Sequence, residues 1–331
     1  MVPTVTKQRT WPALIAGLAV AAAVASAAIA IHRRWPTVSP HVVAVAAGIG
    51  LANLWPSIPR LEPGLAVSGR TVLRMGVVLM GVRLSVSDLA ALGVGAIAST
   101  VAVVALTFVG IRALGRLLGL DPGLSLLVAV GFSICGASAI AAARPLSTAS
   151  DEEAGYAVGL VTICGTLAIW ILPMVGRSLG MTDADFGLWV GASVHDVGQV
   201  VAAASTQGDA ATESAVMVKL ARVSMLAPLL ALLALGRGRP AASTGARRPL
   251  VPWFVALFLA AVSLRSLGLI PVAAHAPIRS VEAWLLAMGM VGLGSQVRMA
   301  RLATLGARPL LLGLAGWVLV AGAAWVAFVA M

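Results

Sequence analysis

The chain has 331 residues, of which 60% are hydrophobic and only 11% are charged, and its mean hydropathy is +1.00. A soluble domain carries about 25% charged residues, so this composition excludes an ordinary water-soluble fold. The net charge of +11 comes from basic residues in short clusters between apolar runs. This pattern orients a membrane protein, and it argues against a nucleic-acid-binding domain.

Apolar runs of about twenty residues predict transmembrane helices, because a helix satisfies its own backbone hydrogen bonds within hydrocarbon. We therefore expect an all-α polytopic membrane protein with about 11 spans (10–11). In chain order, helices are predicted near residues 11–31, 41–56, 70–86, 90–111, 124–144, 155–176, 184–205, 214–236, 251–268, 281–297 and 308–330.

The first helix requires a choice between a signal peptide and a retained span. Its apolar run from Trp11 to Ile31 exceeds the signal-peptide core of about 7–15 residues, so we predict that it is retained. Residues 1–36 then form a tail with the first helix, and residues 37–331 form a single transmembrane core. The longest polar stretch runs from 237 to 248.

Orientation follows from the lysines and arginines between spans. With the N-terminus inside, fifteen fall on the inside and six on the outside. This bias predicts an inside N-terminus and an outside C-terminus. The outside set comprises Arg33, Arg34, Arg83, Arg144, Arg265 and Arg279.

A Gly-x4-Gly pattern recurs in three predicted helices, at Gly76 and Gly81, at Gly131 and Gly136, and at Gly289 and Gly294. Two interpretations are open. The pattern is typical of transporter repeats with interrupted helices, here 41–178 and 184–331, and equally of small residues that allow close helix packing.

Polar side chains at membrane depth are costly, and they mark candidate functional sites. The helix predicted at 184–205 contains Ser193, His195, Asp196 and Gln199, bracketed by Gly191 and Gly198. The glycines would permit local unwinding. An imidazole beside a carboxylate is a candidate proton relay. A lone buried histidine that is only hydrogen-bonded is the alternative.

Two basic residues, Lys219 and Arg222, lie three apart in the next predicted helix and therefore share one face. A surplus of positive charge over Asp196 favours a bound anion, and an internal salt bridge is the alternative. On the anion interpretation, Lys219→Met or Arg222→Met abolishes anion transport and leaves the fold largely intact.

The helix predicted at 124–144 contains a run of small residues with Ser133, Cys135, Gly136 and Ser138. Such a run can interrupt a helix and expose backbone N–H groups that attract anions. Close helix packing is the competing explanation.

These stretches together resemble the YeiH-like family of bacterial membrane proteins, also called UPF0324. The matching segments are Phe132–Ala143, Gly191–Ala202 and Lys219–Leu-Ala-Arg222 continuing to Pro228, with a further likeness at Gly76–Leu84. The likeness covers roughly residues 40–330. The segment from Gly294 to Arg298, with several arginines after it, departs from the pattern.

The resemblance implies a secondary transporter of the inner membrane, in a family named for a proposed export of sulfate or related sulfur-containing anions. It also implies five-helix inverted repeats with broken, crossing helices. We expect Ser133, Cys135, Gly136, Ser138, Ser193, Gln199, Lys219 and Arg222 to bind the solute, and His195 and Asp196 to couple a proton or sodium ion. No cofactor, metal, catalytic residue or nucleic-acid partner is expected, and a homo-oligomer, such as a dimer, fits this class.

Two alternatives to a carrier are open. One is an intramembrane enzyme that uses Ser193, His195 and Asp196. Its weakness is that neighbouring residues on a helix do not face one another. The other is a membrane scaffold or channel subunit without coupled turnover.

Overall fold

The computed structural model describes residues 11–35, 39–55, 58–84, 87, 93–235, 253–298 and 306–330. Within these ranges the regular structure is helical and contains no strand, which confirms the all-α class. The predicted polar stretch 237–248 lies outside them. Six described helices are long and apolar enough to cross a membrane, at Trp11–Arg34, Arg60–Arg83, Gly93–Leu117, Glu152–Ser178, Asp209–Leu235 and Ala307–Phe328. The total of 10–11 spans and the orientation stay predictions.

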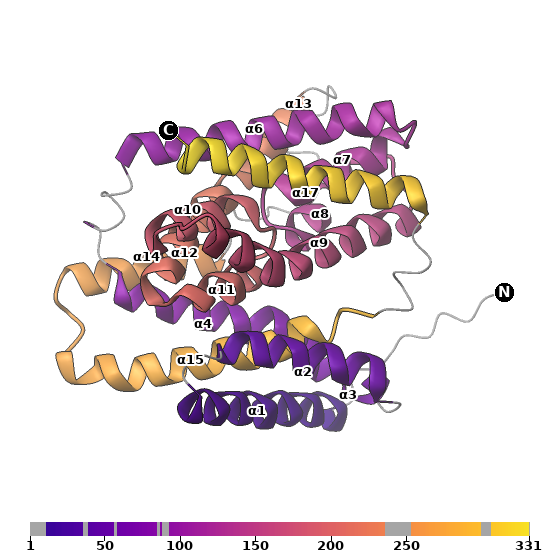
Figure 1. The fold of residues 1–331 in the computed structure, drawn as a ribbon. Coiled ribbons are helices and arrows are strands. Elements are labelled where there is room, and N and C mark those ends of the chain that lie inside the picture. The colour runs from indigo at the N-terminus through magenta and orange to yellow at the C-terminus, as the bar shows by residue number, and fades with distance from the viewer. Residues whose placement is uncertain are drawn as a thin grey trace. The chain divides into compact units, whose positions relative to one another are not determined.

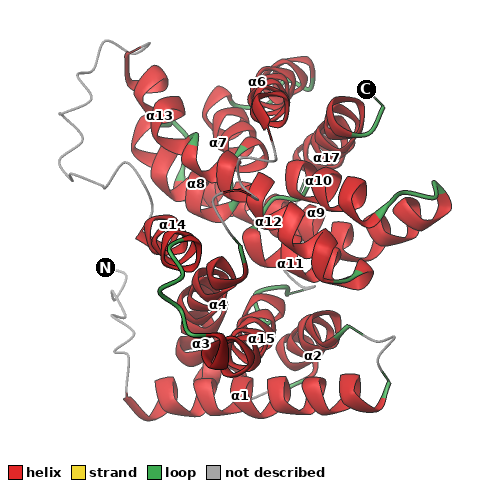
Figure 2. Ribbon diagram, turned by 90° about the vertical axis from the view of Figure 1, so that its left-hand side faces the viewer, coloured by secondary structure: helices red, strands yellow, loops and turns green. Residues whose placement is uncertain are grey.

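The chain forms two compact units, residues 1–77 with 276–299 and residues 78–275 with 300–331. In the first unit, α1 packs against α2 and α3 (Figure 2). Its elements are α1 (Trp11–Arg34), α2 (Pro40–Leu54), α3 (Ile58–Val67), the π-helical turn η1 (Ser68–Val72), the start of α4 (Leu73–Met80) and most of α15 (Val272–Gly294). The predicted division at residue 36 and the predicted repeats stay predictions.

Two helices begin earlier than predicted. The helix expected at 70–86 begins at Ile58, and the one expected at 281–297 begins at Val272. Each of the two added N-terminal segments contains a proline, Pro63 or Pro277. In a sequence a proline indicates the end of a helix, but membrane helices tolerate it. The second correction moves Glu282 from a helix end to the middle of α15, where it is buried.

The glycines of the first unit serve close packing. A Cβ on Gly76 would lie 2.8 Å from Leu286 of α15, and one on Gly289 would lie 2.6 Å from Leu73. A Cβ on Gly294 would collide with the Val45 carbonyl oxygen of α2. For this unit the packing interpretation of the Gly-x4-Gly pattern accounts for the observed contacts.

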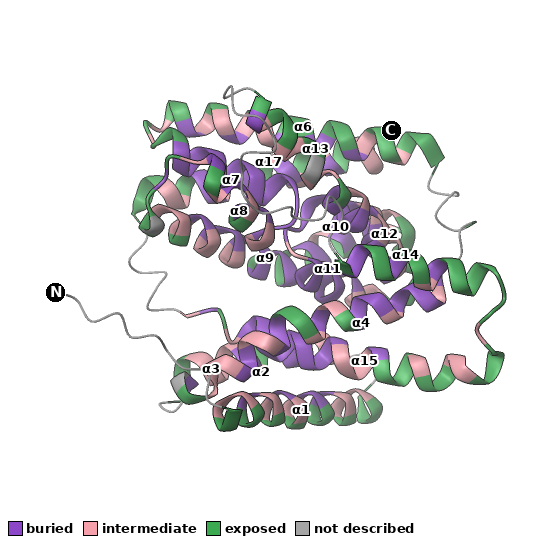
Figure 3. Ribbon diagram, turned by 180° about the vertical axis from the view of Figure 1, so that it is seen from behind, coloured by how far each residue is buried: buried purple, intermediate pink, exposed green. Residues whose placement is uncertain are grey.

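In the second unit, α6 and α17 lie side by side (Figure 1), and more than half of the residues in each of α7, α10, α11 and α12 are buried (Figure 3). The outer helices expose apolar side chains such as Val94, Val109 and Val318, at 83%, 64% and 67%. Exposed apolar faces of this extent suit lipid. The elements are η2 (Gly81–Arg83), α6 (Gly93–Leu117), α7 (Pro122–Ser133), α8 (Ala137–Ala143), η3 (Arg144–Leu146), α9 (Asp151–Ser178), α10 (Asp183–Ser193), α11 (Val197–Ala204), η4 (Ser205–Gln207), α12 (Asp209–Ser224), α13 (Leu226–Leu235), α14 (Trp253–Ser266) and α17 (Ala307–Phe328).

An ion-pair cluster fixes the start of α12. Arg83 in η2 contacts Asp209 at 3.1 Å and Glu213 at 2.6 Å. The pair with Glu213 is the better shielded from solvent, because the two side chains are 16% and 28% exposed, whereas Asp209 is 58% exposed. The cluster anchors the helix that carries Lys219 and Arg222.

Candidate functional site

The helix predicted at 124–144 is two helices, α7 and α8, as its run of small residues suggested. Asp121 caps α7 by accepting hydrogen bonds from Gly123 N and Leu124 N, at 2.6 and 3.1 Å. The helix ends at Ser133, and the chain turns at Ile134–Gly136 before α8 begins. Gly136 has φ +69° and ψ −133°, a conformation open in practice only to glycine.

Gly136→Ala is expected to destabilise the protein by about 1–3 kcal/mol, because alanine is strained at this backbone conformation. Its Cβ would also lie 2.9 Å from Val161 of α9. Thermal unfolding of the purified protein measures the effect. Gly322→Ala in α17 is the matched control, because a Cβ there meets nothing within 4 Å, and it should be neutral or stabilising by about 0.5–1 kcal/mol. Equal unfolding temperatures for the two variants would contradict the strain argument.

The helix predicted at 184–205 is also interrupted, between α10 and α11. Residues Val194–Asp196 leave the helix, and α11 begins again at Val197. Asp196 accepts from Gly198 N at 2.9 Å, while Gln199 Oε1 accepts from Asp196 N at 3.1 Å. This reciprocal capping box gives α11 a fixed start.

The bracketing glycine Gly191 has a different role from the one expected of it. It lies within α10, and a Cβ there would collide with the Ala215 carbonyl oxygen of α12. Gly187, one turn earlier, meets Ala211 of α12 in the same way. Close backbone approach at these two positions brings α12 alongside α10, so that its basic residues reach both interruptions.

Lys219 and Arg222 bind the C-terminal ends of α7 and α10, the helices that precede the two interruptions. Lys219 Nζ donates to the carbonyl oxygens of Ile134 and Val194, each at 2.7 Å. Arg222 donates to the carbonyl oxygens of Phe132 and Ser133, at 2.7 to 3.1 Å. Both side chains are fully buried.

The same guanidinium also binds the end of α10. Its Nη1 donates to the carbonyl oxygens of Ala192 at 2.6 Å, Val194 at 3.1 Å and Gly191 at 3.2 Å. The last carbonyl groups of a helix have no intrahelical donor and carry the negative end of the helix dipole. One arginine and one lysine therefore satisfy two interrupted helices at once.

These contacts alter the charge argument made from the sequence. Two cations beside one carboxylate favoured a bound anion over an internal salt bridge, but backbone carbonyl oxygens already surround both cations. The surplus charge therefore has a structural use at the interruptions. Participation of Lys219 and Arg222 in solute binding stays a prediction.

Ser133 and Ser193 occupy equivalent positions, because each is the last residue of the helix before an interruption, α7 or α10. Ser133 Oγ donates to the Ala129 carbonyl at 2.6 Å, and Ser193 Oγ donates to the Trp189 carbonyl at 2.7 Å. Each hydroxyl satisfies the preceding turn of its own helix and is fully buried. Cys135 is buried and makes no disulfide, and Ser138 in α8 is half-buried.

His195 lies where the two interruptions meet. A Cβ on Gly136 would be 3.8 Å from its carbonyl group, and its ring centroid is 4.1 Å from that of Phe132. The side chain is fully buried, yet among the described residues neither ring nitrogen has a hydrogen-bond partner. The Phe132 carbonyl oxygen lies close to the imidazole and accepts from Arg222. A buried imidazole without a well-formed hydrogen bond costs free energy, which makes His195 a candidate functional residue.

Comparison with known proteins places the chain in a family. A family model described as conserved hypothetical protein 698 matches residues 13–313. The chain belongs to the UPF0324 family. A UPF0324 membrane protein of Corynebacterium glutamicum is 38% identical over 88% of this chain and 86% of its own. TauZ of Paracoccus pantotrophus is 39% identical over 92% of each chain.

The UPF0324 inner membrane protein YeiH of Salmonella typhi is 32% identical over 96% of this chain and 95% of its own. With the six apolar helices above, these relatives identify the present UPF0324 protein as a multi-pass inner membrane protein. No solved structure matches it.

The site of this UPF0324 protein brings most of the predicted residues together. The interruptions join Ser133, Cys135 and Gly136 to Ser193 and His195, and α12 adds Lys219 and Arg222. Gln199 lies slightly apart, since its Nε2 donates to the Thr162 carbonyl of α9 at 3.3 Å. Gly165 of α9 leaves the space that the Gln199 side chain fills, and the sequence analysis did not include it among the site residues. The sequence feature that could have indicated it is the repeat of the Ile-Cys-Gly triplet, at 134–136 and again at 163–165.

Proposed function

We propose that this UPF0324 protein is a secondary transporter that moves a small anion across the inner membrane by alternating access. The observation that carries the proposal is the meeting of two interrupted helices inside a buried unit. Irregular backbone at membrane depth occurs where it is enclosed in protein or lines a cavity. Paired interrupted helices form the solute and ion sites of many secondary transporters.

The charge of the enclosing residues supports an anion as the solute. Lys219 and Arg222 are fully buried, and the half-buried Asp196 caps α11 at the same place. The carbonyl oxygens around these cations have no formal charge, so a net positive charge remains, and excess positive charge in a low-dielectric site favours a negative ligand. Sulfate or a related sulfur-containing anion follows from the family's naming, and the serines with Cys135 and Gly136 are the neutral contacts of the proposed site.

His195 and Asp196 are the proposed coupling pair. The imidazole has unused hydrogen-bonding capacity in a buried position. Its unprotonated nitrogen can take up a proton, and the resulting N–H group can donate a hydrogen bond to a bound anion. Binding of a proton or sodium ion would then change the relative stability of two arrangements of the interruptions, as coupling requires. On this proposal the protein is a carrier, not an enzyme, and a homo-oligomer in the bilayer.

Counterflow tests the proposal. Proteoliposomes loaded with unlabelled sulfate are expected to take up external labelled sulfate saturably and faster than protein-free liposomes. Ser138→Ala should weaken the apparent affinity several-fold, since a lost hydrogen bond is worth about 1 kcal/mol. Ser224→Ala is the matched control, because this hydroxyl is exposed and donates to the Ala221 carbonyl of its own helix.

The other outcomes separate the alternatives. Chemical conversion of the added anion would identify an intramembrane enzyme instead. Absence of flux for sulfate, sulfite and small sulfonates, with the protein shown to be folded, would contradict the carrier proposal and favour a scaffold.

A further inference from the structure

Arg70 lies near the middle of a membrane-spanning helix. The apolar stretch from Arg60 to Arg83 is long enough to cross a membrane. At a rise of about 1.5 Å per residue, Arg70 is roughly 15 Å from its start and roughly 20 Å from its end. In the positive-inside count this arginine belonged to a loop, because the helix was predicted to begin at residue 70. Since the helix begins at Ile58, the charge lies well inside a hydrocarbon layer about 30 Å thick.

The backbone around Arg70 is distorted and packs closely against α15. Residues Ser68–Val72 form the π-helical turn η1, a distortion that often occurs at functional sites. Ser68 Oγ donates to the Met288 carbonyl oxygen at 2.7 Å. A Cβ on Gly69 would lie 2.7 Å from the Gly292 carbonyl carbon. Ser68 and Gly69 are therefore buried against α15, whereas Arg70, the next residue, is exposed.

The first unit offers Arg70 little acidic charge. Its sequence, residues 1–77 with 276–299, contains two acidic residues, Glu62 and Glu282. Glu62 pairs with Arg298 at 3.6 Å, and Glu282 is buried in α15. None of the described residues forms an ion pair with the Arg70 guanidinium group. An internal salt bridge therefore does not explain this arginine.

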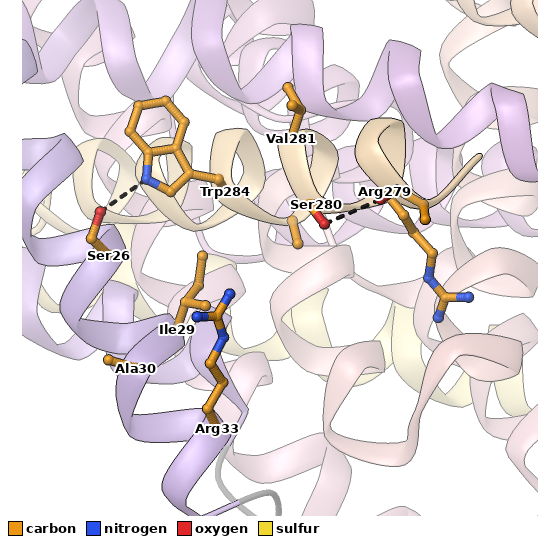
Figure 4. A pocket seen from close by; sticks show the side chains of 10 residues that line it. Ser26, Ile29, Ala30, Arg33, Arg279, Ser280, Val281 and Trp284 are labelled. Carbon is orange, nitrogen blue, oxygen red and sulfur yellow. Dashed lines mark hydrogen bonds between the residues drawn. The ribbon is translucent and has the colours of Figure 1, made fainter. Parts of the chain in front are cut away.

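Other exposed arginines of this unit lie nearer to helix ends. Arg33 and Arg279 line an open groove of about 690 Å³ between α1 and α15 (Figure 4). Arg33 is in the last turn of α1, and Arg279 lies about two turns after the start of α15. A long side chain reaches the membrane interface from such positions. Arg70 is deeper, and a charged side chain at that depth faces the protein interior or a water-filled cavity. Because Arg70 is exposed, the second case applies.

We propose that Arg70 lines a water-filled solute path at mid-depth and binds the anion during transport, an inference that rests on the proposed function. A guanidinium group presents its donors in a planar fork that matches the oxygen atoms of an oxyanion. Lys219 and Arg222 already donate to backbone carbonyl oxygens, whereas no described residue accepts from the Arg70 guanidinium group. Arg70 thus supplies the donors that the two buried cations direct elsewhere.

Thiol labelling in nanodiscs tests whether Arg70 faces water. Arg70→Cys is expected to react with an anionic, membrane-impermeant methanethiosulfonate several-fold faster than Leu106→Cys. Leu106 is the matched control, because it is 53% exposed in the middle of α6, whose exposed apolar face suits lipid. The wild type gives the background rate, since Cys135 and Cys164 are buried.

Counterflow tests whether Arg70 binds the solute. Arg70→Gln should raise the sulfate concentration for half-maximal counterflow about tenfold, because a hydrogen bond between charged groups is lost. Arg70→Lys keeps the charge and should retain part of the affinity. Arg60→Gln is the matched control, because it removes an exposed arginine at the start of the same span, and it should leave that concentration unchanged. Since both arginines are exposed, each variant should unfold at the temperature of the wild type.

Three results would overturn the proposal. The first is labelling of Arg70→Cys no faster than that of Leu106→Cys. The second is disulfide cross-linking of Arg70→Cys under oxidation in the membrane, which would place this face in an interface between two copies. The third is an unchanged half-maximal concentration in Arg70→Gln with active counterflow. If the wild type moves none of the anions, the proposed function fails by itself, and the labelling rate still decides whether Arg70 faces water.

Discussion

Replacing Arg222 with leucine is expected to lower the free energy of unfolding by about 3–5 kcal/mol. The guanidinium donates to carbonyl oxygens at the ends of α7 and α10, and leucine leaves these buried acceptors without partners. Each unsatisfied buried acceptor costs about 1–3 kcal/mol. Chemical unfolding of the detergent-solubilised protein measures the loss. The sequence alone led us to expect that such a variant would fold and fail only in transport.

The control for this prediction is Arg265→Leu in α14. It removes an arginine of equal size and charge whose side chain is exposed, so its stability should change by no more than about 0.5 kcal/mol. Lys219→Met is expected to fall between the two, since Lys219 Nζ donates to two buried carbonyl oxygens, those of Ile134 and Val194. An Arg222→Leu protein as stable as Arg265→Leu would show that the interruptions do not depend on the guanidinium.

Replacing His195 with leucine is expected to leave stability unchanged or to raise it, while sulfate counterflow falls at least about tenfold. The imidazole makes no hydrogen bond to any described residue, and removal of an unsatisfied buried polar group recovers its desolvation cost. A group that destabilises the fold yet is required for turnover acts in function. Parallel unfolding and counterflow measurements on the same preparation give both values.

The opposite pattern would contradict the assignment of His195. If His195→Leu lost stability and kept full counterflow, the imidazole would be part of the packing around Phe132. His195→Gln provides a second reading, because glutamine keeps hydrogen-bonding capacity but does not titrate. Counterflow retained in His195→Gln and lost in His195→Leu would assign a role in solute binding, whereas loss in both would favour proton coupling.

Much of the local structure was predictable, because its causes lie in short stretches of sequence. Long apolar runs located the helices, and the interruptions were expected where small or polar residues replace apolar ones, near Gly136 and near His195. The predicted starts of two helices were wrong, because each helix continues through an internal proline and begins earlier, at Ile58 or at Val272. Proline reads as a boundary in a sequence, and only packing against neighbouring helices decides whether a membrane helix continues through it.

By itself the sequence determined that this is an all-α membrane protein, and it indicated two places where a helix could be interrupted beside polar residues, because hydropathy and glycine conformation act locally. The tertiary structure decided which groups meet the charges of α12. Backbone carbonyl oxygens have no residue-type signature, so no pattern indicates that Lys219 and Arg222 bind the ends of α7 and α10. The tertiary structure also buries the His195 ring nitrogens without a hydrogen-bond partner among the described residues, a state visible only once the surrounding helices are in place.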